Sequence, residues 1–361
     1  MSLRHWSCRF VFISAVVATV LGPVAGRGQT PVPPPTVTRV GYEEWGIAVK
    51  HPVLQAACKY CPWGSLADVV KTMMAFYGFD VGICYTCSMQ NAVRTVAKRL
   101  PSIELSDRTI ALGVKSAGPP APMDFGVTSL GGVLNAYRGQ IPDLPEGSSL
   151  RLIARIEQPS YLMMAVTRAS GLTDLRQVHE RKMPIRILGG NAAIQEYYHL
   201  TEKDVTALGG AIYPGNALDK NENFDVIIGS GVMSNYPEGN MWYEMTMKKD
   251  LMFLPIPEEV RQRLVKESPL ATLVNLPFRY MKGVGDAPIA SVGTSGTAVY
   301  SREDVPDGFA YAVAKAVDEH RDLLKWAVMP FSFDSRTVAD GAGVPVHPGA
   351  AKYYRERGYL K

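Results

Sequence analysis

The chain has 361 residues, which suits two domains of roughly 100–200 residues each. Hydrophobic residues make up 47% of it and charged residues 20%, which excludes a disordered, collagen-like or coiled-coil protein. Its 38 basic and 34 acidic residues give a net charge of +4, too even a balance for a nucleic-acid-binding protein, and a mean hydropathy of −0.02 argues against several membrane spans.

Residues 1–26 have the pattern of a secretory signal peptide. Arg4 and Arg9 form a basic start, residues 10–21 form an apolar run, and small residues follow that suit a signal peptidase. The run is shorter than the roughly 20 residues that a membrane-spanning helix needs. We therefore expect cleavage and export to the periplasm, with an uncleaved anchor as the alternative. Residues 27–38 form a proline-rich linker, so the folded part should begin near residue 39.

Beyond the signal sequence the chain has two CxxC pairs, Cys58 with Cys61 and Cys84 with Cys87. The periplasm favours disulfides over free thiols, so we expect these cysteines to form disulfides, for which three connectivities are possible. A structural zinc ion held by four thiolates is one alternative. A redox-active pair is another, because Lys59 would lower the pKa of the neighbouring thiol.

Hydrophobic periodicity predicts strands that alternate with helices, the pattern of parallel α/β sheets. A polar segment with a proline at residues 157–160 separates two apolar strands, and we interpret it as a hinge between two lobes. The expected strands are residues 45–50, 80–85, 124–127, 150–156, 161–166, 184–188, 224–231, 251–256 and 290–300, of which residues 224–231 end in a glycine-rich turn at Gly229–Gly231. The expected helices are residues 66–77, 92–100, 191–200 and 257–266, one that begins at Thr128-Ser129, and one that begins at Pro306 and turns Phe309, Val313, Val317 and Leu324 inward.

In open α/β sheets, ligands bind outside the carboxyl ends of the strands, where helix N-termini offer free N–H groups to an anion. Several predicted corners of this kind supply candidate ligand-binding residues, and Tyr161, Tyr236 and Tyr280 are candidates, with Trp63, for the walls of an apolar pocket. The candidates at the corners are Trp63, Gly64, Ser65, Thr86, Ser88, Thr128, Ser129, Gly190, Asn191, Ala192, Ser230 and Gly231. Because a GxSxG elbow, an HExxH motif and a P-loop lysine are all missing, we expect no catalytic residues, no cofactor and no metal.

The end of the chain carries the strongest family signal. Residues 345–350 read PVHPGA, and Tyr353-Tyr-Arg-Glu356 and Gly358 follow. In order and spacing this resembles the PxHPGA…YYRE-G signature of the TAXI family of solute receptors, which serve TRAP transporters in the periplasm. Residues 124–129, 159–162 and 170–175 are also similar to segments of that family. The resemblance covers residues 120–361.

The resemblance implies a type II-like periplasmic binding protein with two lobes, each a mostly parallel sheet flanked by helices. Residues 39–157 with 290–361 would form the first lobe, and residues 158–289 the second. A monomer of this kind closes on a small organic anion, a carboxylate or an amino acid, and passes it to TRAP permease subunits. The family's glycine-rich first loop is replaced here by residues 58–64. The alternative is a secreted, disulfide-stabilised enzyme or redox protein that uses the CxxC pairs.

Overall fold

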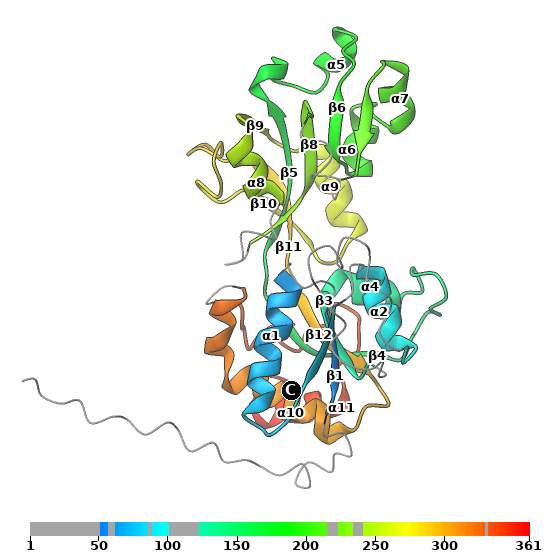
Figure 1. Ribbon diagram of the computed structural model, residues 1–361, viewed down its shortest axis with the longest axis vertical. Helices are drawn as coiled ribbons and strands as arrows, with labels where there is room; N and C mark the ends of the chain where they lie inside the picture. Colours follow the sequence, from blue (N-terminus) through cyan, green and yellow to red (C-terminus); the bar gives the residue numbers. More distant parts are fainter. Residues whose placement is uncertain are drawn as a thin grey trace, which may run out of the picture. The chain divides into compact units, whose positions relative to one another are not determined.

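The computed structural model describes residues 51–56, 62–85, 89–100, 123–214, 223–233, 241–328 and 331–361. The predicted signal peptide, the linker and the strand at residues 45–50 lie outside the described residues. The described chain forms two β-sheets, each flanked by its own helices (Figure 1). The predicted two-sheet α/β fold is therefore confirmed.

The first sheet is mixed. Strand β1 runs parallel to β2 and β3, whereas β12 runs antiparallel to β3 and β4. Helices α1, α10 and α11 pack on one face through one apolar core, and α2 and α4 pack on the other face through a second core. In sheet order the strands are β2 (Gly82–Tyr85), β1 (Val53–Ala56), β3 (Phe125–Ser129), β12 (Thr297–Arg302) and β4 (Leu150–Ile156). The helices are α1 (Pro62–Ala75), α2 (Met89–Ala97), α4 (Leu130–Tyr137), α10 (Asp307–Glu319) and α11 (Pro348–Glu356).

The second sheet is mainly antiparallel, so the prediction of mostly parallel sheets is wrong. Strand β5 follows β4 directly and enters between neighbours that run the opposite way, and only β6 pairs in parallel, with β7 and β8. In sheet order the strands are β10 (Ala271–Asn275), β11 (Ala290–Thr294), β5 (Ser160–Thr167), β8 (Val226–Val232), β6 (Arg186–Gly189) and β7 (Ala211–Tyr213), with β9 (Leu251–Leu254) on β5. The helices are α5 (Gln177–Glu180), α6 (Ala192–Tyr197), α7 (Glu202–Ala207), α8 (Met241–Lys248) and α9 (Glu258–Glu267).

Helix α10 shows how the sequence pattern builds the core of the first sheet. Phe309, Val313 and Val317 are all buried, as their helical spacing predicts, and Leu324 is buried in the 3₁₀ turn that follows. The ring of Phe309 meets those of Phe79 and Phe125 edge-on, with centroids 5.7 and 5.2 Å apart. These rings fix α10 against the sheet and against the end of α1.

Two glycine-containing segments differ from their predicted structure. Residues 290–300 form two strands rather than one, because β11 belongs to the second sheet and β12 to the first. The chain changes sheet at Ser295-Gly296, where Gly296 has φ +115°, a conformation that favours glycine. The segment Gly229–Gly231, predicted as a turn, lies inside β8 and pairs with β5. Pairing with β5 keeps it extended, and the missing side chain of Gly231 leaves space that Met163 and Trp242 fill.

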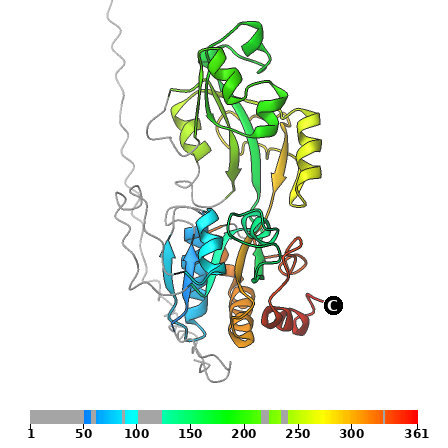
Figure 2. The same cartoon turned by 90° about the vertical axis from the view of Figure 1, so that its right-hand side faces the viewer.

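Residues His347–Ala350, within the TAXI-like ending, form the start of a helix. His347 is the N-cap of α11, and its Nδ1 accepts a hydrogen bond of 3.2 Å from the Gly349 amide. Proline at the first helical position suits this start, because its missing N–H would have no partner there. Helices α10 and α11 pack side by side, and α9 packs beside β11 of the second sheet (Figure 2).

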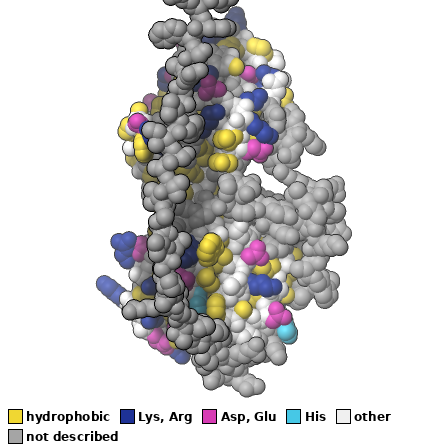
Figure 3. Space-filling view, turned by 60° about the vertical axis from the view of Figure 1, so that its left-hand side comes forward, with side chains coloured by type: hydrophobic (Ala, Val, Ile, Leu, Met, Phe, Trp, Pro, Cys, Tyr) yellow, Lys and Arg dark blue, Asp and Glu magenta, His cyan; other side chains and the backbone are white. Residues whose placement is uncertain are grey.

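The surface shows no segregation of charge on the face drawn in Figure 3, where basic and acidic side chains are interspersed. Exposed side chains of opposite charge also pair, as Arg263 does with Glu196 and Glu267. In the part of the chain that the structure describes, no helix has the length and apolar character needed to cross a membrane.

Buried tyrosines make the fold sensitive to alkaline pH. Burial raises the pKa of Tyr300 and Tyr354, and burial together with the Asp318 carboxylate raises that of Tyr353. Above pH 10 the unfolded chain loses phenolic protons that the native protein keeps, so the free energy of unfolding should fall by about 1.4 kcal/mol per pH unit and tyrosine. Urea unfolding between pH 8.5 and 11 measures the slope. Tyr300→Phe should reduce it, and an unchanged slope in that variant would contradict the assignment.

Candidate functional site

The carboxyl ends of the parallel strands of both sheets adjoin the two segments where the chain passes between the sheets. These segments, residues 157–159 and 295–296, are called the crossings below. In the first sheet, Ser129 at the end of β3 pairs with Thr297, directly after the second crossing. In the second sheet, Val232 at the end of β8 pairs with Ser160, directly after the first crossing. Such edges are where ligands of open α/β sheets bind.

Ser129 lies at the carboxyl end of β3 and caps the helix that follows. Its Oγ accepts a hydrogen bond of 3.1 Å from the Gly132 amide at the start of α4, as its position before an apolar run predicts. The Leu130 amide donates to the carbonyl of Gly296, 3.0 Å away, which ties this corner to the second crossing. Thr128, predicted with Ser129, is completely buried, and its Oγ1 has no hydrogen-bond partner among the described residues.

The first turn of α1 lies at the same edge. Helix α1 begins at Pro62, follows β1 and packs against β3. Trp63 is partly buried against the core beneath α1, Gly64 is buried, and Ser65 is partly exposed. The structure therefore brings this predicted corner to the edge that holds Ser129.

Gln158, in the first crossing, is a residue that the sequence reasoning missed. Only 4% of its surface is exposed, and its Oε1 accepts a hydrogen bond of 2.7 Å from the Thr297 hydroxyl. Its Nε2 is buried and has no partner among the described residues. A buried amide that lacks a partner is costly, so this donor suits an acceptor group of a ligand. The only sequence signal for it was its place in the polar segment between two apolar strands.

Aromatic residues line the corresponding edge of the second sheet. Tyr161 pairs with Gly231 in the sheet, and its ring meets that of Tyr280 edge-on at 5.4 Å. Burial raises the pKa of Tyr161, so its hydroxyl stays protonated as a hydrogen-bond donor. Ser230, one residue back along β8, is exposed and pairs with Leu162. The structure thus brings Tyr161, Tyr280 and Gly231 together, whereas Ser230, paired with Leu162, faces the other side of the sheet.

The predicted corner at Gly190–Ala192 lies farther along the same sheet. The Gly190 amide donates to the Ile228 carbonyl at 2.9 Å, so it is not free for a ligand. Asn191 caps α6, and its side chain accepts from the Ile194 amide at 3.2 Å. Ala192 lines a cavity of about 460 Å³ together with Tyr213 and residues of α6 and α7. The Asn191 cap satisfies one of the N–H groups on which the anion prediction relied.

A larger groove of about 580 Å³ lies between α5 and α6. Its polar groups already contact one another. Arg176 pairs with Asp174 at 3.2 Å and donates to the Tyr197 hydroxyl at 2.9 Å, and the His179 ring bonds the His199 carbonyl at 2.8 Å. Internal pairing of this kind leaves the guanidinium with fewer donors for a ligand.

Several predicted site residues lie outside the described residues: Thr86, Ser88, Tyr236, Cys58, Cys61 and Cys87. Cys84 is buried in β2, beside the parallel strand β1. Cys58 and Cys61 follow β1 in the sequence, whereas Cys84 lies within the neighbouring strand β2, and the disulfides remain a prediction. Within the described ranges, no three His, Cys, Asp or Glu side chains gather as a metal site would require.

A family model described as the NMT1-like family matches residues 120–358. No curated protein matches the chain.

Three solved structures show a low similarity. The periplasmic nitrate-binding protein NrtA from Synechocystis PCC 6803 is 11% identical, with a TM-score of 0.38 over 78% of this chain and 66% of that one, a little under two thirds of its length. A binding protein component of an ABC phosphonate transporter from Pseudomonas aeruginosa is 10% identical, with a TM-score of 0.39 over 78% of this chain and 79% of that one. A TRAP periplasmic solute binding protein from Sulfitobacter sp. NAS-14.1 with bound β-D-galacturonate is 10% identical, with a TM-score of 0.36 over 85% and 94%. These scores are too low to bear on the ligand of this chain.

Proposed function

Because the chain belongs to the NMT1-like family, we propose that it is a periplasmic solute-binding protein that captures a small organic anion, a carboxylate or an amino acid. The ligand would be held between two lobes, residues 39–157 with 290–361 and residues 158–289, and passed to the permease subunits of a TRAP-type transporter. The TAXI-like ending at residues 345–358 supports the TRAP assignment over other transporter types.

One observation carries the proposal: candidate residues from both sheets adjoin the same two crossings. Ser129 and Gln158 contact the second crossing or the strand directly after it, and Tyr161 is the second residue of the strand that follows the first crossing. A ligand bound at these edges would contact both lobes at once. The ligand would therefore stabilise the arrangement of the lobes in which it makes more contacts.

The chemistry of these edges suits a carboxylate with an apolar body. The first turns of α1 and α4 place positive ends of helix dipoles at the edge of the first sheet, and Gln158 adds an amide donor. Tyr161 and Tyr280 provide apolar surface and a protonated hydroxyl. A few directional donors with aromatic walls are the usual composition of small-molecule sites.

We expect the melting temperature to rise when the protein binds pyruvate, succinate or L-glutamate, because a ligand that binds only the native state stabilises it by about 2.7 kcal/mol at 100 times Kd. Differential scanning fluorimetry over such a panel identifies a binder, and calorimetry gives its Kd. Tyr161→Ala should then weaken binding about tenfold, or about 1.4 kcal/mol. Tyr243→Ala, on the exposed face of α8, is the matched control and should bind as the wild type does. If no carboxylate or amino acid shifts the melting temperature, the proposal fails.

A further inference from the structure

Within the described residues, the chain passes between the two sheets only at the two crossings. Each sheet has its own apolar cores, and Leu270, just before β10, also packs against the core beneath α4 of the first sheet. A change in the angle between the sheets must therefore be absorbed at residues 157–159 and 295–296. What holds these two short segments determines how freely the sheets can move.

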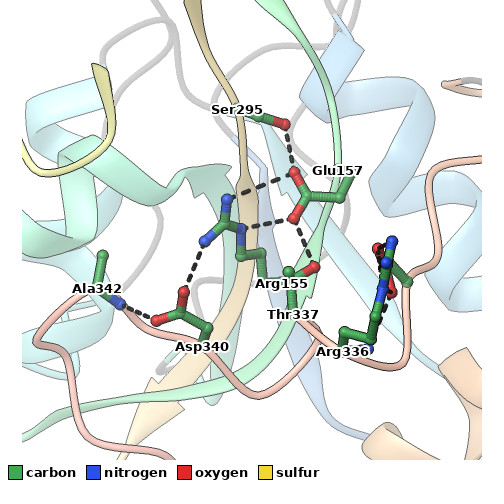
Figure 4. A network of polar contacts seen from close by, with 8 residues as sticks. Arg155, Glu157, Ser295, Arg336, Thr337, Asp340 and Ala342 are labelled. Carbon is green, nitrogen blue, oxygen red and sulfur yellow. Dashed lines mark hydrogen bonds and ion pairs between the residues drawn. The ribbon is translucent and has the colours of Figure 1, made fainter. Parts of the chain in front are cut away.

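The carboxylate of Glu157 joins three segments of the chain (Figure 4). On the second crossing, the Ser295 hydroxyl donates to Oε2. On the segment that follows α10, the Thr337 hydroxyl donates to Oε1 at 2.6 Å. On its own strand, Arg155 forms an ion pair with Oε1, with 2.8 Å between Nε and the oxygen. The Glu157 side chain is only 18% exposed and that of Arg155 only 14%, so water screens these contacts weakly.

A second brace connects the same two crossings. Gln158 holds the Thr297 hydroxyl at 2.7 Å, so consecutive residues of the first crossing bond residues on either side of Gly296. Gly296 itself is confined: a Cβ at this position would lie 3.1 Å from Leu130 Cδ2 and 3.3 Å from Arg155 Nε. The glycine provides the unusual backbone conformation at this point, and the bonds of Glu157 to Ser295 and of Gln158 to Thr297 hold the residues on either side of it.

The segment 332–340 acts as a third support. The Glu157 amide donates to the Ser332 carbonyl and the Arg155 amide to the Val338 carbonyl, each at 2.7 Å. Arg155 also contacts Asp340, with 3.1 Å between Nη1 and Oδ2. The first crossing is therefore bonded on one side to the second crossing and on the other to a segment 180 positions away.

We propose that Glu157 is a latch that sets the hinge between the two sheets. Its hydrogen bonds to Ser295 and Thr337 hold both crossings and the segment 332–340 in one geometry, and rotation of the sheets requires one of these bonds to be exchanged. The consequence for ligand capture rests on the proposed function: the latch would set how often the site opens. The latch itself is a property of the ligand-free chain.

The test uses the full chain without ligand. Hydrogen exchange followed by mass spectrometry reports on peptides that cover residues 155–160 and 293–298, and X-ray scattering reports on the spread of the radius of gyration. Charge-assisted hydrogen bonds contribute enough that Glu157→Ala should speed exchange in both peptides about tenfold or more and broaden the distribution of radii. Ser295→Ala should speed exchange mainly at residues 293–298, and Thr337→Val mainly at residues 155–160.

The control is Asp334→Asn, in the same C-terminal segment. The described hydrogen bonds and ion pair of the Asp334 side chain are all with Arg336, the shortest at 2.6 Å, so exchange at the crossings should stay as in the wild type. Should Glu157→Ala prove unstable, the two hydroxyl variants carry the test, because each removes one bond and leaves the Arg155–Glu157 pair intact. Wild-type exchange at the crossings in both hydroxyl variants would overturn the latch. Since no ligand is used, this outcome is distinct from a failure of the carboxylate panel.

Discussion

Replacing Gly349 with alanine is expected to lower the free energy of unfolding by about 4 kcal/mol, the size of the most damaging single substitutions. A Cβ at this position would lie 1.9 Å from the carbonyl oxygen of Asp307 and 2.7 Å from its carbonyl carbon. These are backbone atoms at the start of α10, so no change of rotamer can relieve the clash, and α11 must move away from α10. Urea unfolding followed by circular dichroism measures the loss.

Gly131→Ala is the matched control for this substitution. Gly131 lies in the first turn of α4, and the atom nearest to its added Cβ would be Leu270 Cδ1 at 3.7 Å, an ordinary contact. Alanine has the higher helix propensity, so this variant should keep or gain stability, by up to about 1 kcal/mol. Equal losses in the two variants would show that the close packing of α11 on α10 is not the cause.

Asp318→Ala should cost about 3 kcal/mol, because it removes an acceptor shared by four donors. Asp318 is the buried carboxylate of α10, with a fully buried side chain. Its oxygens accept from the Tyr353 hydroxyl at 2.8 Å, from Arg357 at 3.0 Å, from Arg321 at 2.9 Å and from the Tyr359 hydroxyl at 3.2 Å. The two arginines are partly exposed and regain water, whereas the Tyr353 hydroxyl loses its buried partner.

Asp322→Ala, four residues later on an exposed position, controls for the loss of one carboxylate and should change stability by less than about 0.5 kcal/mol. The stability loss in Asp318→Asn should lie between those of Asp318→Ala and Asp322→Ala. The asparagine amide keeps one acceptor oxygen, but its NH₂ group faces the donors of Tyr353 and the arginines. The same unfolding assay compares all three variants. A loss in Asp318→Ala no larger than that in Asp322→Ala would rule out the network as an anchor for α11.

Local features of the fold could be predicted from the sequence. The helices at Ser129 and Asn191 begin where the sequence predicts, since a helix start depends on a few consecutive residues, and the structure shows both side chains as caps. The inward face of α10 follows from its apolar spacing alone. Strand direction could not be predicted in this way, because it depends on which distant strands pair. Strand β5 has antiparallel neighbours that lie dozens of residues later in the chain.

The candidate site was predictable only in part, for the same reason. The polar segment at residues 157–160 was correctly placed between two strands, but its partners Ser295 and Thr337 lie 138 and 180 positions away. The glycines of Gly229–Gly231 suggested a turn, whereas the side chains of Met163 and Trp242, which occupy the space at Gly231, explain why small residues stand in a strand. Gln158 has no motif around it, and its unpartnered amide is visible only once the crossings are folded.

The position of β12 has a consequence for the order in which the protein folds. This strand lies between β3 and β4 in the first sheet, yet it comes from residues 297–302, after every strand of the second sheet has been synthesised. Residues 160–294 hold every strand of the second sheet, so this sheet can form while the N-terminal strands still lack their central neighbour. We therefore expect the second sheet to form first, and the first sheet to close only when residues 297–302 add β12 between β3 and β4.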